Sequence, residues 1–182
     1  MPEMRTAPFE LRLPKANAIP VVFDSPHSGR FYPEDFRSNA PHKLLRQGED
    51  AYVDELIADA AAEAGIAVLL ANYPRCYIDA NRDPDDIDAE LLAEPWPTPL
   101  KPTQKTRMGV GLIRRHVVPG VEVHAEKLTV AEVRHRIDDI YWPYHNALRD
   151  TLEDLRARFG FVEHIDWHSM KSVGNAMTPD KG

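Results

Sequence analysis

Residues 19–29, with the sequence IPVVFDSPHSG, decide the fold, because a short apolar run ends there in a polar loop that carries a histidine. Residues 161–169 (FVEHIDWHS) repeat this order near the other end of the chain. In open α/β sheets, ligands collect where the strands end, so we expect His27 and His168 to face a crevice rather than the core. The two stretches predict an α/β sheet with a metal site at the ends of its strands.

The residues that follow the first stretch alternate between helical and strand-like spacing. Residues 50–64 carry apolar side chains at helical spacing, and they precede Gly65, a residue type favoured just after a helix. Residues 66–71 form a continuous apolar run, and residues 76–79 are a candidate for a third, shorter strand. This order predicts a mixed, mainly parallel sheet flanked by helices.

The C-terminal part of the sequence predicts two consecutive helical segments and a strand. Thr129 and Glu132 match a capping box, and apolar residues at helical spacing follow them. We expect Pro143 to kink or restart this helix, because proline lacks the backbone donor. Helical spacing continues to Gly160, after which residues 161–167 are typical of another strand.

Residues 83–128 fit neither spacing well, and they contain six prolines and the segment Gly109-Val110-Gly111. Long connections of this kind are often functional loops. Two interpretations stay open for this segment: a loop over the active site, or a surface excursion that only packs against the rest of the protein.

The composition excludes several classes of partner. With 182 residues, of which 43% are hydrophobic, the chain can bury a core, and we expect residues 1–182 to form a single domain. The net charge of −7 argues against binding to nucleic acid or to anionic membranes. No apolar run approaches the roughly 20 residues that span a bilayer, and residues 1–20 lack the apolar core of a signal peptide. We therefore expect a cytoplasmic protein; the sequence does not indicate its oligomeric state.

Any metal must be bound by histidine and carboxylate, because Cys76 is the single cysteine of the chain. Catalytic zinc commonly takes three protein ligands and keeps one position for water. His27 and His168 supply two ligands, so a carboxylate is needed as the third. The candidates are Glu49, Asp50, Asp24 and Asp166.

A series of short motifs extends along nearly the whole chain. In order, they are Ser25-Pro26-His27-Ser28-Gly29-Arg30 with Tyr32-Pro33, Asp50 with Val53-Asp54-Glu55-Leu56, Arg75 with Asp79-x-Asn81-Arg82-x-Pro84, Gly109-Val110-Gly111-Leu112-Ile113, Tyr141-x-x-Tyr144-His145-x-x-Leu148, and Asp166-x-His168-Ser169-Met170. In their order and spacing, these motifs resemble those of the N-formylglutamate amidohydrolase (N-formylglutamate deformylase) family. Each motif is only a few residues long, so the specificity lies in the series.

The resemblance implies a fold similar to that of the zinc carboxypeptidases and a zinc-bound water that hydrolyses an amide. It implies His27 and His168 as ligands, with Asp50 preferred over Glu49 as the third. The zinc carboxypeptidase pattern has a glutamate where this chain has Arg30. Asp24 and Asp166 then suit a role in orienting the two imidazoles. Simple capping of the following helix is the alternative role for Glu49 and Asp50.

The implied reaction converts N-formyl-L-glutamate into formate and L-glutamate in histidine degradation. A substrate with two carboxylates needs arginines that can form bidentate pairs. The candidates for binding substrate are Arg30, Arg75, Asn81, Arg82 and His145. The alternative is that Arg75 and Arg82 are surface charges balanced by nearby acids. Arg114 and Arg115 are equally consistent with a substrate-facing lid and with solvated charge.

Proteins of this family are longer, so we expect the general base beyond Gly182 and expect the domain to lack its C-terminal third. No residue of the sequence is assigned as the base. The alternatives are an amidohydrolase of another N-acyl amino acid, a carboxypeptidase-like peptidase, and a relative that binds metal or carboxylate without catalysis.

Overall fold

The computed structural model describes residues 6–118 and 120–170, and it contains the predicted mixed, mainly parallel sheet flanked by helices. The strands lie in the order β1 (Phe9–Arg12), β3 (Ala67–Ala71), β2 (Val21–Ser25) and β6 (Glu163–Asp166). The β2 strand is parallel to both β3 and β6, whereas β1 is antiparallel to β3. Parallel pairing places the carboxyl ends of β2 and β6 at the same edge of the sheet.

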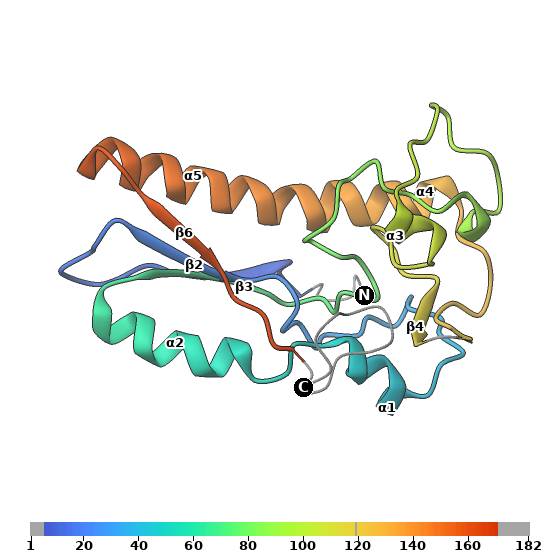
Figure 1. The fold of residues 1–182 in the computed structure, drawn as a ribbon, viewed down its shortest axis with the longest axis horizontal. Helices are drawn as coiled ribbons and strands as arrows, with labels where there is room; N and C mark the ends of the chain where they lie inside the picture. Colours follow the sequence, from blue (N-terminus) through green and yellow to red (C-terminus); the bar gives the residue numbers. More distant parts are fainter. Residues whose placement is uncertain (1–5, 119, 171–182) are drawn as a thin grey trace, which may run out of the picture.

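Helices α2 (Val53–Ala64) and α5 (Trp142–Phe159) cover opposite faces of this sheet (Figure 1). Successive side chains of a strand point to opposite faces, and β3 uses both. Val68 and Leu70 pack with α2, whereas Ala67 packs with Leu155 of α5. Every residue of β3 is buried, which explains its continuous apolar sequence.

The end of α2 is set by Gly65, as predicted. Gly65 has φ of +77° and caps the helix through a hydrogen bond from its backbone N–H to the carbonyl of Ala61. A Cβ at this position would collide with the backbone oxygen of Asn17. Glycine is therefore required here both by conformation and by space.

Gly65→Ala is expected to lower the free energy of unfolding by about 2 kcal/mol or more, because it combines a left-handed conformation with a backbone collision. Gly160→Ala is the matched control. Gly160 also has a positive φ, of +85°, but a Cβ there would meet nothing within 4 Å, so about 1 kcal/mol is expected. Urea unfolding measures both losses. Equal losses in the two variants would contradict a contribution from the contact with Asn17.

Helix α4 (Val130–Arg136) begins at the predicted capping box. The Thr129 side chain accepts the backbone N–H of Glu132, and the Glu132 carboxylate accepts the backbone N–H of Thr129. A π-helical turn, η3 (Ile137–Tyr141), connects α4 to α5 just before Pro143. The predicted restart therefore takes the form of a local change in helical winding.

One expectation about strands was wrong, and one strand was not expected. Residues 76–79 are not a strand: residues 75–77 form a turn, and the backbone N–H groups of Tyr77 and Ile78 both donate to the carbonyl of Pro74. A short apolar run can be buried in a turn as well as in a strand, and spacing alone does not separate the two. The edge strand β1 was not predicted; its residues alternate between partly buried and exposed, so it carries little apolar signal.

Residues 83–128 pack extensively against the remainder of the protein. Leu112 and Val123 are fully buried, in one apolar cluster with Ile137 and Ile140. The short elements between β2 and α2 are α1 (His42–Leu45) and η1 (Arg46–Gly48). Those within residues 83–128 are η2 (Ala89–Leu91), α3 (Gln104–Arg107), β4 (His116–Val118) and β5 (Val121–Glu122). Within the described part of the chain, no helix has the length and apolar character needed to cross a membrane.

Candidate metal centre

The ends of β2 and β6 bring His27 and His168 together, as the sequence predicts. Asp24 and Asp166 are paired in the register of these parallel strands, and each histidine follows its strand by two residues. The two Nδ1 atoms lie 3.1 Å apart. His27 is buried, whereas the side chain of His168 is 31% exposed, so the pair is open to solvent on one side.

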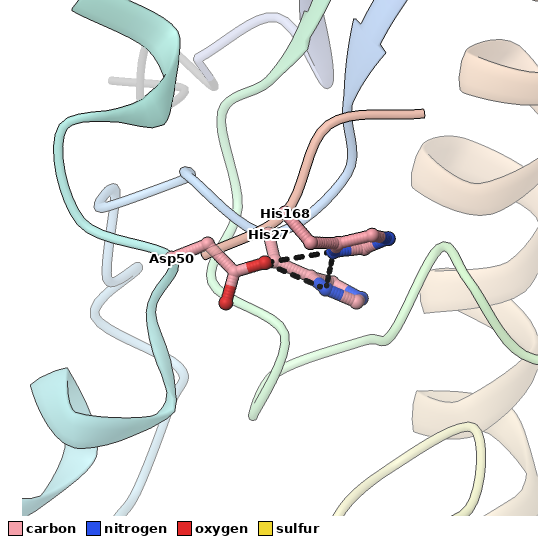
Figure 2. A group of neighbouring side chains, drawn as sticks. All are labelled: His27, Asp50 and His168. Carbon is pink, nitrogen blue, oxygen red and sulfur yellow. Dashed lines mark hydrogen bonds and ion pairs between the residues drawn. The ribbon is translucent and has the colours of Figure 1, made fainter. Parts of the chain in front are cut away.

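Asp50 completes a group of three potential ligands (Figure 2). Its Oδ2 lies 2.7 Å from Nδ1 of His168 and 3.4 Å from Nδ1 of His27. The backbone N–H of Asp50 donates to the carbonyl of His27, which ties the two loops together. Glu49 points elsewhere, since its carboxylate accepts the Tyr32 hydroxyl and pairs with Arg46. Of the two candidate carboxylates, Asp50 is therefore the one at the histidines.

The three side chains fit a zinc ion in both geometry and chemistry. A tetrahedral zinc with bonds of about 2.05 Å holds its ligand atoms about 3.3 Å apart. The separations between the three ligand atoms are 2.7, 3.1 and 3.4 Å. Two neutral imidazoles and one carboxylate are also ligands that zinc accepts.

Carboxylates hold the outer nitrogen of both histidines. His27 donates from Nε2 to Oδ1 of Asp79 at 2.7 Å, and His168 donates from Nε2 to Oδ2 of Asp166 at 2.9 Å. With Nε2 held in this way, Nδ1 of each histidine faces the Asp50 carboxylate and Nδ1 of the other histidine. This arrangement is typical of histidines that bind metals.

The expected role of Asp24 was wrong, and Asp79 takes it instead. Asp24 accepts the Tyr144 hydroxyl at 2.6 Å and pairs with His164 at 2.7 Å. The sequence signal for Asp79 was its motif with Asn81, which was used only to predict substrate contacts. The role of Asp166 is present as expected.

Two arginines lie against Asp79, on the side away from His27. Arg75 donates from Nε and Nη2 to Oδ2 of Asp79, and its Nη1 is 3.9 Å from Oδ1 of Asp50. Arg114 reaches the same oxygen at 3.6 Å from residues 83–128. Burial alone would raise the pKa of the Asp79 carboxyl, but its hydrogen bond with His27 and the charges of His27, Arg75 and Arg114 hold this pKa below the usual range.

Arg114 is a largely buried cation whose one ion-pair partner among the described residues is Asp79. Its side chain is 12% exposed, and its Nε is buried without a hydrogen-bond partner among the described residues. Burial and the nearby charges of Arg75 and Arg82 lower the pKa of Arg114 to about 10, despite the attraction of Asp79. This combination favours binding of an anion.

Of the other predicted substrate residues, Asn81 contacts the histidine pair, whereas Arg82 contacts its own loop. Asn81 is in contact, since its Nδ2 donates to Asp166 and lies 3.0 Å from Nε2 of His168. Arg82 donates to the backbone carbonyls of Asn81 and Val110, which holds its own loop.

His145 and Arg30 make no contact with the three potential ligands. His145 donates to the carbonyl of Ala80, and its ring packs on Tyr141. Arg30 forms ion pairs with Asp54 and Glu55 of α2, and its side chain is 45% exposed.

Comparison with known proteins identifies the family. The family model for N-formylglutamate amidohydrolase matches residues 19–182, which include all three potential ligands. This chain belongs to the N-formylglutamate amidohydrolase family. The N-formylglutamate deformylases of Pseudomonas putida and Pseudomonas aeruginosa are each 29% identical to it, over 85% and 87% of this chain. These matches cover 53% and 54% of the relatives, so the chain spans about half the length of these curated proteins.

Solved structures of similar fold agree with this membership. The N-formylglutamate amidohydrolase of Ralstonia eutropha JMP134 superposes with a TM-score of 0.86 and is 50% identical, over 91% of this chain and 59% of that one. A protein from Agrobacterium tumefaciens superposes with a TM-score of 0.68 over 91% of this chain and 57% of its own. At 14% identity, this second match supports the fold alone.

Proposed function

We propose that this chain takes part in the hydrolysis of N-formyl-L-glutamate to formate and L-glutamate, with Zn²⁺ bound by His27, Asp50 and His168. The observation that carries the proposal is the meeting of three ligand atoms at separations suited to zinc, beside a largely buried pair of arginines. Membership of the N-formylglutamate amidohydrolase family supports the reaction.

The described residues divide the work between metal and substrate. A bound Zn²⁺ would supply Lewis acidity and an activated water for attack on the formyl carbon. Asp79 and Asp166 hold Nε2 of the two histidines and so direct both Nδ1 atoms inward, toward the position of the metal. In the overall reaction water adds to the formyl carbon, the C–N bond breaks, and the leaving amine takes up a proton.

Recognition of the substrate is assigned to arginines, because N-formylglutamate carries two carboxylates. Arg114 is the stronger candidate, since its Nε has no partner among the described residues and Asp79 is too distant for a hydrogen bond. Arg75 is already bonded to Asp79 and would share its donors with a ligand. Asn81 and Arg82, which are neighbours on one loop, are further candidates for binding substrate. Arg30 is not, because its ion pair with Asp54 holds it on α2.

Several finer predictions belong to the same proposal. A zinc carboxypeptidase-like architecture is supported by two histidines at the ends of parallel strands. The general base is expected beyond Gly182, within the length of the relatives that this chain does not span. The cytoplasmic location and the place in histidine degradation stay predictions.

The test measures zinc content by elemental analysis together with formate release from N-formyl-L-glutamate. We expect about one zinc per chain. A chelator should remove this zinc and abolish formate release, and adding zinc back should restore both. Zinc without formate release would favour another N-acyl amino acid, a peptide, or a role without catalysis. A chain that binds no zinc would contradict the proposal.

A further inference from the structure

Asp79 is shared between a candidate metal ligand and the arginine pair. It is fully buried. Its Oδ1 accepts Nε2 of His27 at 2.7 Å and the backbone N–H of Asn81 at 3.0 Å. Its Oδ2 accepts Nε and Nη2 of Arg75 at 3.2 and 3.0 Å. One carboxylate therefore joins the two halves of the site.

The acceptor capacity of Asp79 is filled by these contacts. An ionised carboxylate offers about four lone-pair positions, and His27, Asn81 and Arg75 occupy that number. Arg114, at 3.6 Å, remains outside hydrogen-bond distance. Among the described residues, no other carboxylate forms an ion pair with Arg114. A buried cation left in this state is costly, so an external anion is expected to bind it.

We propose that Asp79 is a positioning residue through which carboxylate binding at Arg75 and Arg114 strengthens metal binding at His27. The inference rests on the proposed function for the identity of the metal and of the anion. It adds that the two ligands do not bind independently.

The direction of the effect follows from competition for Asp79. In the ligand-free chain, Arg75 and Arg114 draw on the negative charge of Asp79, which weakens its hold on His27. A bound carboxylate takes up donors of both arginines and offsets their charge. Asp79 then acts more strongly on Nε2–H of His27, which makes Nδ1 a better metal ligand. By thermodynamic reciprocity, the metal strengthens carboxylate binding by the same factor.

The experiment compares the zinc affinity of the 182-residue chain with and without saturating glutarate, a dicarboxylate that cannot be hydrolysed. Competition with a chromophoric chelator gives the zinc affinity, and calorimetry establishes saturation by glutarate. We expect glutarate to tighten zinc binding at least about fivefold, the lower end of typical couplings between sites. Calorimetry of the zinc-loaded and zinc-free chain should give the same factor for glutarate.

Three variants separate the role of Asp79 from simple attraction between the two ligands. Asp79→Asn is expected to weaken zinc binding by about 10- to 100-fold and to reduce the effect of glutarate to within about twofold. Arg75→Gln keeps the bond between Asp79 and His27, so zinc still binds, but the effect of glutarate should fall in the same way. Arg149→Gln, an exposed arginine paired with Asp150, should preserve the full coupling.

The possible failures are distinguishable. Zinc affinity that is unchanged by bound glutarate would overturn the coupling and leave the proposed function intact. Coupling that persists in full in both Asp79→Asn and Arg75→Gln would assign it to through-space attraction and would also overturn the role of Asp79. A wild-type chain that binds no zinc would overturn both the coupling and the proposed function.

Discussion

Asp50→Asn is expected to lower the zinc affinity of the chain by more than about 100-fold. Loss of a residue that only orients a metal ligand typically costs about 10- to 100-fold, and loss of a charged ligand should exceed this. Oδ2 of Asp50 lies within 3.4 Å of Nδ1 of both His27 and His168. Chelator competition and elemental analysis of the purified variant measure the loss.

Glu49→Gln is the matched control for this prediction, because it changes the neighbouring carboxylate. Oε1 of Glu49 accepts the Tyr32 hydroxyl and Oε2 accepts Nε of Arg46. In the variant, the amide oxygen can still accept from Arg46 while the amide NH2 donates to the Tyr32 oxygen. Zinc affinity should therefore stay within about threefold of the wild type. Loss of zinc in Glu49→Gln with retention in Asp50→Asn would reverse the choice between the two acids. Retention of zinc in both variants would show that neither of these two carboxylates is a metal ligand.

The sequence was sufficient to place the two histidines, for a reason that lies in the sheet. The β2 strand is a short apolar run that ends in polar residues, whereas β6 has Ile165 as its one apolar residue and is exposed along its length. The parallel pairing of the two strands follows from the helices between them. Once both strands are in one sheet, residues just beyond their carboxyl ends must lie close together. The spacing of His27 and His168 from those ends therefore predicts that the two side chains meet.

The partners of the two aspartates at the strand ends could not be predicted in the same way. Asp24 and Asp166 occupy paired positions, yet Asp24 binds Tyr144 and His164 whereas Asp166 binds His168. The difference comes from what packs on each residue, since α5 brings the Tyr144 hydroxyl to Asp24. Sequence spacing carries no information about such contacts between distant elements.

The roles of Asp79 and Arg114 could not be decided from the sequence, for related reasons. Asp79 follows a buried turn, which the sequence suggested to be a strand, and it lies in a region rich in acidic residues. Arg114 belongs to residues 83–128, whose spacing fits no regular element. Its position depends on the packing of Leu112 and Ile113 in the core. Burial turns an apparently solvated charge into an anion-binding group, and burial depends on the whole fold.

Arg114→Met is expected to weaken glutarate binding by about 30-fold or more. Removing one partner of a buried, hydrogen-bonded charge pair costs about 2 kcal/mol or more, and each 1.4 kcal/mol is tenfold in affinity. Methionine keeps most of the apolar volume of the arginine stem. Where formate release can be measured, the KM for N-formyl-L-glutamate should rise in parallel. The control is Arg30→Gln, which removes an exposed ion pair with Asp54 and Glu55 and should leave glutarate affinity within about twofold.

Arg114→Met is not expected to destabilise the ligand-free protein. Arg114 is buried with its Nε unpartnered among the described residues, so removing its charge relieves an unfavourable state. Without ligand, Arg114→Met should therefore unfold at the temperature of the wild type or above it, whereas the same concentration of glutarate should stabilise the wild type more than the variant. This pairing of lost affinity with retained stability is typical of a binding group that is kept for function. A variant that loses both together would instead assign Arg114 a structural role, in which its contact with Asp79 mainly holds residues 83–128 against the sheet.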